Sequence, residues 1–328
     1  MKYINKEIPI KYIDGYKLRG RNFFYDVKKE NDELLEQYRD LIKKYDDFIC
    51  LLCNSNKGKI YLEWKEEYQL VKCDNCNVIS ANINECIDNL YDDEGHYERS
   101  AEMIAKNYEY RKTTFGIERY NYCIKRLSLN SSKINVLDIG SGFGYFLSVL
   151  NDKGVKNKGL EIDPLSVNYS KDIGLNVSNT SIDKELDSSY ELIVMFDVLE
   201  HLYNPMDFCT EVSKKIKKNG YLIAYTPNIH SIGFELMDSK QNLLHPFQHV
   251  CFYNEESLKY LADKIGFEII SIDYFGLDIM DYLFMKEYED KYPYFERLNE
   301  FSTFIQACID KLGISNHLRI TYKKINEN

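Results

Sequence analysis

The chain has 328 residues, enough for one large domain and a small one, and its composition is that of a globular protein. Its formal net charge of -10 and pI near 5.3 argue against a broad nucleic-acid surface, because phosphate binding uses clusters of Lys and Arg; a local basic patch stays compatible with these totals. No stretch of roughly 18 uncharged apolar residues occurs, so we expect no signal peptide, no membrane-spanning helix and a cytoplasmic location.

Residues 1–46 are predicted to form an N-terminal arm and a helix. Residues 1–28 alternate apolar and basic positions around two glycines, which suggests a short hairpin or an extended arm with no assigned role. Residues 30–45 carry apolar side chains at helical spacing and are polar elsewhere, so we expect a helix that leads into the next segment.

Residues 47–80 contain two C-x-x-C pairs separated by 19 residues: Cys50, Cys53, Cys73 and Cys76. Two thiols three positions apart can grip one metal ion, and a second pair completes a tetrahedral site of four sulfurs. We expect a zinc ribbon with a closed, structural zinc site; iron is the alternative metal, and redox chemistry or free thiols are the alternative interpretations. The other five cysteines are scattered and are expected to act as small hydrophobic residues: Cys86, Cys123, Cys209, Cys251 and Cys308.

Residues 81–130 are predicted to be a helical cap and linker. An acidic and aromatic loop over residues 91–97 is followed by a helical pattern over residues 98–127.

Residues 131–328 alternate strand and helix patterns, which predicts an α/β domain with a mostly parallel sheet and helices on both faces. The predicted strands are residues 135–139, 158–162, a weak one at 176–180, 191–196 and 221–226, closed by a pair at 267–274 and 317–323 that includes an antiparallel last strand. Residues 278–311 are expected to form a helical insertion that covers the substrate side.

The first predicted strand of this domain leads into a glycine turn, Asp138-x-Gly140-x-Gly142-x-Gly144, and then a helix. Glycines allow a sharp turn and close approach of a ligand to the backbone. The dinucleotide fingerprint G-x-G-x-x-G would need a third glycine where Tyr145 stands. The carboxylate of Asp138 would repel a pyrophosphate, but it suits a ligand that carries an ammonium group.

Two later stretches complete a pattern. Glu161 ends the second strand, 21 residues beyond Gly140, and Asp197-x-x-Glu200-His201 ends another strand. Together the three motifs resemble those of the class I S-adenosylmethionine-dependent methyltransferases, with a nucleotide-binding fold of another kind as the alternative.

The resemblance implies a Rossmann-like sheet and a donor site. Asp138 would bind the ammonium group of S-adenosylmethionine, the glycine turn would pass under its methionine portion, and Glu161 would bind the ribose hydroxyls. The candidate donor-binding residues are Asp138, Gly140, Ser141, Gly142, Phe143, Gly144, Glu161, Ile162, Asp183 for the adenine amino group, and Phe196 and Asp197 at the methionine end. Helices before the first strand often cover this pocket in the family, so Tyr91, His96 and Tyr97 are lid candidates, or else surface and packing aromatics.

The candidate catalytic residues follow the third motif and the fifth strand. Glu200 and His201 lie where ligands of open α/β sheets bind, and His201 is the first candidate for a general base; the alternative is that it only fixes the loop at 202–205. His249 and Tyr253 could bind or deprotonate the substrate, and His230 and His245 are weaker candidates.

Over about residues 48–325, a ribbon, a cap and a class I domain resemble bacterial methyltransferases of sugar and polysaccharide biosynthesis. The resemblance implies a small-molecule acceptor, a sugar nucleotide or surface-glycan precursor. Related sugar C-methyltransferases usually carry a further carboxyl-terminal domain that this chain is too short to hold, so oxygen or nitrogen methylation is expected at least as much as carbon methylation. One rival is an RNA or protein methyltransferase that uses the ribbon to hold its substrate. Another is a donor-binding protein without turnover. The oligomeric state stays open.

Overall fold

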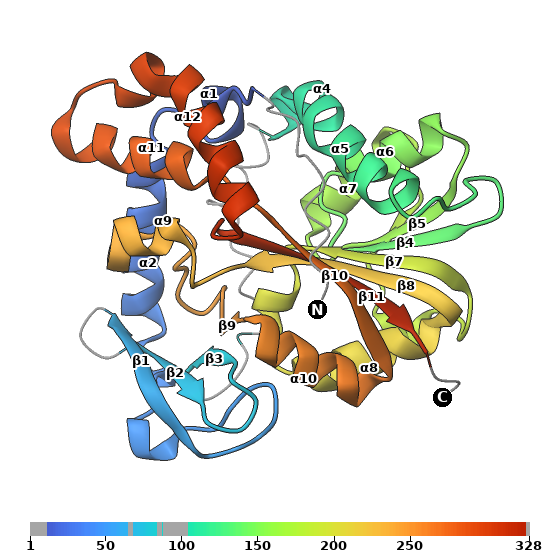
Figure 1. The fold of residues 1–328 in the computed structure, drawn as a ribbon, viewed down its shortest axis with the longest axis horizontal. Helices are drawn as coiled ribbons and strands as arrows, with labels where there is room; N and C mark the ends of the chain where they lie inside the picture. Colours follow the sequence, from blue (N-terminus) through green and yellow to red (C-terminus); the bar gives the residue numbers. More distant parts are fainter. Residues whose placement is uncertain (1–11, 65–67, 84–86, 88–103, 326–328) are drawn as a thin grey trace.

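The computed structural model describes residues 12–64, 68–83, 87 and 104–325. Its centre is a seven-stranded sheet with the order β10-β11-β8-β7-β4-β5-β6, and a four-stranded sheet, β1-β2-β3-β9, lies beside it (Figure 1). The predicted α/β class, with a mostly parallel sheet and a small N-terminal antiparallel sheet, is confirmed.

The large sheet follows the predicted strands closely. Its members are β4 (Asn135–Ile139), β5 (Lys156–Leu160), β6 (Val177–Ser178), β7 (Tyr190–Phe196), β8 (Ile216–Pro227), β10 (Phe267–Phe275) and β11 (His317–Lys324). The first five run parallel, and β11 pairs antiparallel with both β8 and β10. The chain leaves β4 toward β5 on one side and returns to β7 on the other, which makes the carboxyl end of β4 the switch point where such sheets bind ligands.

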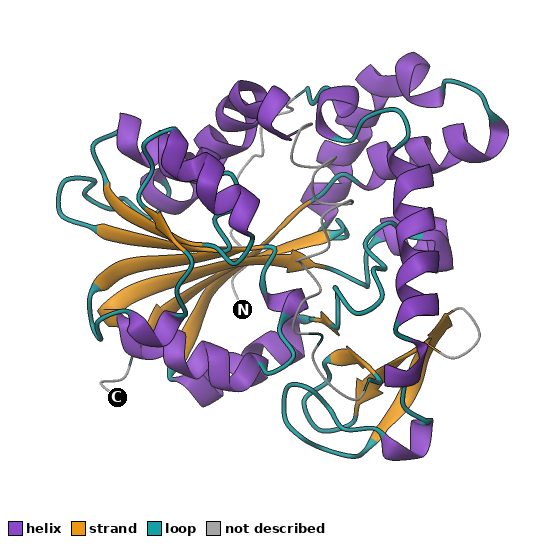
Figure 2. Cartoon of the chain, turned by 180° about the vertical axis from the view of Figure 1, so that it is seen from behind, coloured by secondary structure: helices purple, strands orange, loops and turns teal. Residues whose placement is uncertain are grey.

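Helices cover both faces of this sheet (Figure 2). One face carries α5 (Ile117–Tyr120), α6 (Tyr145–Asp152) and α7 (Pro164–Asp172), and the other carries α8 (Pro205–Lys215) and α10 (Glu255–Ile265), as Figure 1 shows. The two-residue period of β7 explains how one strand serves both layers: Leu192 and Val194 join one hydrophobic cluster, whereas Ile193 and Met195 join the other.

The small sheet contains β1 (Gly58–Trp64), β2 (Tyr68–Cys73) and β3 (Ile79–Ala81). We call residues 48–83 the ribbon. Its fourth strand, β9 (Cys251–Phe252), comes from the far end of the chain and pairs antiparallel with β3. The ribbon also shares one continuous hydrophobic cluster with α8, α10 and one face of the large sheet. The ribbon is therefore built into the core rather than tethered to it.

The N-terminal arm is helical in its described part, which corrects the expected hairpin or extended arm. α1 (Gly15–Leu18) is followed by α2 (Phe23–Gln37) and two short 3-10 turns, Arg39–Leu41 and Tyr45–Asp47. α2 begins earlier and ends earlier than the predicted helix over residues 30–45. Its early start includes Phe24, which packs against Met237 and Met285 of the remote helical layer. Residues 1–11, which carry most of the alternating pattern, lie outside the described residues.

The helical cap is described from residue 104 onward. It contains α4 (Tyr108–Arg111) and α5, joined and followed by π-helical turns at Lys112–Gly116 and Asn121–Lys125. The proposed lid residues Tyr91, His96 and Tyr97, and also Cys86, lie outside the described residues. The predicted helical insertion forms α11 (Asp278–Asp290) and α12 (Tyr294–Leu312). The domain boundaries at residues 46, 80 and 130 stay predictions.

The remaining elements are short: α9 (Ile232–Met237) and 3-10 turns at Ile182–Lys184, Leu199–His201 and Asp238–Lys240. Within the described ranges, no helix combines the length and the apolar character needed to cross a membrane.

Candidate functional site

The glycine turn after β4 adopts a backbone that other residues rarely adopt. Gly140, Gly142 and Gly144 have φ values of +70°, +51° and +72°. A Cβ on Gly140 would lie 2.6 Å from Cγ2 of Val198, whereas one on Gly142 would meet no atom within 4 Å. The turn thus requires glycine at its first position, and it leaves room for a ligand above its middle.

Asp138 lies just before this turn and is 1% exposed. Its Oδ1 atom has no hydrogen-bond partner among the described residues. Burial raises the pKa of Asp138 to about 7, against the lowering effect of Arg119 and with a further rise from Glu161. A buried carboxylate oxygen without a donor is costly, and an ammonium group of a ligand would supply both the donor and the positive charge.

Glu161, after β5, faces the turn from the neighbouring strand. Its carboxylate accepts backbone N–H groups from Gly142 at 2.6 Å, from Ile162 at 2.7 Å and from Asp163 at 2.9 Å. Burial raises the pKa of Glu161, and these three hydrogen bonds oppose that rise. Glu161 therefore connects the first and second motifs directly.

Asp183, expected at the adenine, is exposed and forms an ion pair with the adjacent Lys184 at 2.8 Å. The side chain of Ile162 is 65% exposed at the same edge of the sheet. Ser141 and Phe143 are buried within the turn, and the Oγ of Ser141 has no partner in the described structure.

Asp197 follows β7 with a φ of +60°, an uncommon conformation for a residue with a side chain. Its carboxylate lies 3.4 Å from Nε2 of His317 and 3.7 Å from Nη2 of Arg119. Although burial acts to raise the pKa of Asp197, the hydrogen bond and charge of His317 and the Arg119 guanidinium hold it well below its usual value. The Arg119 guanidinium also lies 4.2 Å from the centre of the Phe196 ring.

Arg119 and His317 were not identified from the sequence. Each comes from an element far from the motifs, the cap and β11 respectively, and each was one polar residue among many in its segment. Only the pairing of β11 with β8 places His317 beside the carboxyl end of β7.

A second group of side chains lies past Asp197: Glu200, His201 and His249. Their ligand-type atoms all lie within 4.8 Å of one another, and the two imidazole rings are 4.7 Å apart. Glu200 is completely buried, and its Oε2 accepts a hydrogen bond from Thr226 Oγ1 at 3.1 Å. Two carboxyl-edge loops, after β7 and after β8, thus bring together residues 48 positions apart. We call this group the Glu-His-His cluster.

Burial governs the charge of this cluster. It lowers the pKa of His201 to about 4, against the opposing charge of Asp197, and it lowers the pKa of His249 well below its usual value. Burial also raises the pKa of Glu200 well above its ordinary range, with a contribution from Asp197. Both imidazoles are therefore neutral near pH 7 and each carries a nitrogen lone pair.

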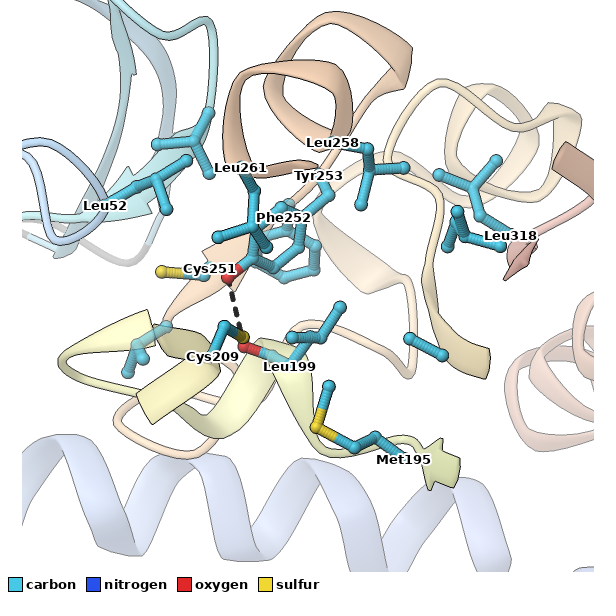
Figure 3. Close-up of a cluster of buried hydrophobic side chains, with 14 of the residues drawn as sticks. Leu52, Met195, Leu199, Cys209, Cys251, Phe252, Tyr253, Leu258, Leu261 and Leu318 are labelled. Atoms are coloured by element: carbon cyan, nitrogen blue, oxygen red, sulfur yellow. Dashed lines mark hydrogen bonds between the residues drawn. The ribbon is translucent and has the colours of Figure 1, made fainter. Parts of the chain in front are cut away.

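The other residues predicted near the acceptor have different positions. Tyr253 is fully buried in the core, and its hydroxyl donates to the Leu199 carbonyl at 3.3 Å (Figure 3). His230 is exposed and its Nδ1 lies 3.3 Å from the Tyr61 hydroxyl of the ribbon. The His245 ring is 5.1 Å from that of His249, so it borders the Glu-His-His cluster.

The four ribbon cysteines, Cys50, Cys53, Cys73 and Cys76, also gather their sulfur atoms within 4.8 Å of one another. The Cys50 and Cys76 sulfurs are 3.5 Å apart, and those of Cys53 and Cys73 are 3.6 Å apart. Tetrahedral ligands about 2.3 Å from a zinc ion would be about 3.8 Å from one another. The arrangement therefore fits a metal ion held by four thiolates, and we call it the cysteine cluster.

Parts of the chain are similar to known proteins. Residues 110–272 match a family profile described as a methyltransferase domain. The chain is 28% identical to a ubiquinone biosynthesis O-methyltransferase of Rickettsia typhi, over 39% of this chain and 58% of that protein. It is 27% identical to a Mycolicibacterium smegmatis protein named a probable S-adenosylmethionine-dependent methyltransferase, over 51% of this chain and 62% of that one. The matches thus span about three fifths of the relatives' length.

Among solved structures, a chain of the complex that contains a Haloferax volcanii methyltransferase activator aligns with a TM-score of 0.50 and 14% identity. The alignment covers 73% of this chain and 99% of that one, and at this identity it concerns the fold alone.

Proposed function

We propose that this chain, which carries a class I S-adenosylmethionine-dependent methyltransferase domain, transfers a methyl group from that donor to a hydroxyl oxygen of a small molecule. The observation that carries the proposal is the buried Oδ1 of Asp138, which has no donor among the described residues and lies at a glycine turn bonded to Glu161. Relatives named as O-methyltransferases support oxygen as the acceptor atom.

The reaction is an in-line displacement. The acceptor oxygen attacks the methyl carbon of the sulfonium, the carbon–sulfur bond breaks, and the sulfur leaves as a neutral thioether; the hydroxyl proton must go to a base or to solvent. The protein's main contribution is to hold donor and acceptor in line and to exclude water. Asp138 and Glu161 would hold the donor, and Phe196 with Asp197 would border its methionine end.

We place the acceptor at the Glu-His-His cluster, because it lies one turn beyond Asp197 at the carboxyl edge of the sheet. In the simplest form of the proposal, His201 takes the hydroxyl proton, with His249 beside it. Burial works against this form. A general base is most effective when its pKa is near the working pH, and the pKa of His201 is about 4.

For the acceptor class we propose a sugar or surface-glycan precursor. The support is the resemblance of the combined ribbon, cap and class I domain to methyltransferases of polysaccharide biosynthesis. For the cysteine cluster we propose structural zinc, because four thiolates leave the metal no open position.

The test is to incubate the metal-replete protein with methyl-labelled S-adenosylmethionine and an extract of the source cells, and to separate the products by size with and without nuclease and protease. Label in a small or glycan fraction that survives both enzymes is the expected result. The matched control is the Asp138→Asn variant, which keeps the side-chain shape but lacks the negative charge.

Label that disappears with nuclease or protease would overturn the proposal in favour of a macromolecular substrate held by the ribbon. Donor binding without labelled product from any fraction would leave a binding protein without turnover.

A further inference from the structure

We infer that Glu200, His201 and His249 bind a divalent metal ion that is distinct from the one suited to the cysteine cluster, and that this ion holds two adjacent oxygen atoms of the acceptor. The metal part stands on the geometry of the cluster alone. The acceptor part rests on the proposed function.

The first observation is a carboxylate oxygen that lacks a donor. Glu200 is completely buried, and only its Oε2 has a partner, the Thr226 hydroxyl at 3.1 Å; Oε1 has no hydrogen-bond partner among the residues that the structure describes. A bond to a metal ion would satisfy that oxygen, and the Thr226 hydrogen bond would hold the carboxylate in place.

The second observation concerns the two imidazole rings. Nδ1 of His249 lies 2.8 Å from the Leu243 carbonyl, and a ring nitrogen of His201 bonds to the backbone carbonyl of Gln248. A carbonyl only accepts, so each ring donates one N–H and its other nitrogen bears a lone pair. Metal-ligating histidines are commonly oriented in this way, by a hydrogen bond from the nitrogen that does not bind the metal.

The third observation is that the loop bearing His249 is held on both sides. The Val250 N–H donates to the Glu200 carbonyl, and the Val250 carbonyl accepts the N–H of Ala81 in β3, both at 2.8 Å. Phe247, whose φ is +63°, donates its N–H to the Tyr68 hydroxyl at 3.0 Å. The ribbon therefore fixes the loop in the position that places His249 against His201 and Glu200.

Two imidazoles and one carboxylate select a different ion chemistry from four thiolates. This donor set suits Mn²⁺, Fe²⁺, Co²⁺ or Zn²⁺, and three protein ligands leave coordination positions open. An ion with open positions can bind both oxygens of an acceptor with adjacent hydroxyls, which sugar rings supply. The bound hydroxyl would lose its proton to solvent more easily, and the resulting oxygen would attack the methyl carbon as the carbon–sulfur bond breaks.

The test begins with protein whose cysteine cluster is filled with zinc, at one zinc per chain by elemental analysis. We would then titrate Mn²⁺, following the disappearance of the free-ion paramagnetic resonance signal, and repeat the titration with Zn²⁺ against a competing chelator. The wild-type chain should bind one further ion. Glu200→Gln and His249→Gln should each weaken that binding at least about 10-fold. Glu235→Gln, which changes an exposed carboxylate outside the cluster, should bind the ion like wild type.

Calorimetric binding of S-adenosylmethionine checks that each variant is folded, and it should be preserved in all three. The metal site is overturned if neither ion binds beyond the first equivalent, or if both ligand variants bind it as tightly as wild type does.

Activity then separates this inference from the proposed function. Chelation of the second ion should abolish transfer to an acceptor with adjacent hydroxyls, and Mn²⁺ should restore it. Transfer that is insensitive to chelation would overturn the role of the ion but leave the methyltransferase proposal intact. Metal binding without transfer to any small hydroxyl compound would overturn the proposed methyl transfer but leave the metal site intact.

Discussion

The cysteine cluster and the Glu-His-His cluster are two groups of ligand-type side chains that differ in how the chain assembles them. The cysteines come from two tight knuckles within 27 residues, and both knuckles are visible as C-x-x-C in the sequence. The Glu-His-His cluster joins a 3-10 turn after β7 to a loop 48 residues later. The first is a local motif, whereas the second exists only because β7 and β8 are neighbours in the sheet.

The clusters also differ in how many coordination positions a bound metal ion would keep open for a substrate. Four thiolates would close the coordination sphere of a metal ion in the cysteine cluster, so that ion would contribute to folding and take no part in a reaction. Nitrogen and oxygen donors that fill only half of a coordination sphere leave room for a substrate. Strand β9 links the two, since it pairs with β3 of the ribbon and begins two residues after His249. The ribbon therefore contacts the loop of the Glu-His-His cluster through backbone hydrogen bonds, between β3 and β9 and from Ala81 to Val250.

The largest effect should follow loss of the cysteine cluster. Cys53→Ser removes one ligand, and because metal binding and folding are coupled in such modules, we expect the ribbon to lose its metal and several kcal/mol of stability. Trp64 is the only tryptophan of the chain, is 5% exposed and packs against Tyr68. Its emission should therefore shift to longer wavelength. Cys308→Ser, at an exposed cysteine, is the control. An unshifted emission with full zinc content in Cys53→Ser would contradict the prediction.

The next largest effect should be on donor binding, which we expect to depend on Asp138 and not on either cluster. Asp138→Asn should weaken S-adenosylmethionine binding by about 10- to 100-fold, because hydrogen bonds to charged groups contribute about 1.5–3 kcal/mol. Glu200→Gln should leave it unchanged within about twofold, since Glu200 belongs to the Glu-His-His cluster and not to the glycine turn. Calorimetry on the two variants measures both values. Equal losses of S-adenosylmethionine affinity in the two variants would contradict the assignment of Asp138 and Glu200 to separate sites.

The pH dependence of donor binding gives a smaller, graded effect. Asp138 has a pKa of about 7, raised by burial, and an ammonium ligand would lower it by favouring the ionised form. Affinity should therefore rise as pH increases toward 7, by up to about tenfold per pH unit below 7. Above about 8 it should fall again, because the α-amino group of the donor, whose ordinary pKa is about 7.7–8.0, loses its proton. The measurement is the dissociation constant of S-adenosylmethionine from pH 6 to 8.5, with Asp138→Asn as the control that should show no such rise toward pH 7. A flat profile for the wild-type chain would count against Asp138 as the ammonium ligand.

The smallest effect tests the link between the two regions. Tyr68→Phe removes the hydroxyl that accepts the Phe247 N–H, and a buried donor left without a partner costs about 1–3 kcal/mol. Part of that cost should appear as motion of the loop that carries His249. We expect Mn²⁺ binding and methyl transfer to fall a few-fold while donor binding stays constant. Tyr61→Phe alters an exposed ribbon tyrosine and should change neither. If the two variants behave alike, the ribbon does not position this loop.

Sequence patterns predicted the large sheet well because its strands repeat simple rules. Acidic residues at or just after the strand ends, Asp138, Glu161 and Asp197, mark parallel strands whose carboxyl ends meet at one edge. The prediction of a hairpin or extended arm was wrong for the described part of the N-terminal arm. Its apolar residue Phe24 lies in a helix that packs on α9 and α11, and periodicity over a short segment does not identify a remote partner. Strand β9 was missed because two residues carry no period at all.

The residues of the candidate site also fall into those that local motifs predict and those that only the fold places. The residues of the glycine turn, Glu161, the cysteines and the pair Glu200–His201 follow from local motifs, because backbone conformation and ligand spacing are properties of a few adjacent residues. Tyr253 was assigned to the acceptor from its position after His249, yet its side chain is fully buried and its hydroxyl donates to the Leu199 carbonyl.

The sequence by itself determined the glycine turn, the four-sulfur cluster and the class of the fold, since each depends on residues close together in the chain. Tertiary structure alone decided that Arg119 and His317 flank Asp197, that His249 lies beside His201, and that the ribbon is completed by β9. Contacts of this second kind depend on which strands are neighbours and on how a buried surface is filled. Those choices are made by the whole core at once, and no short stretch of residues records them.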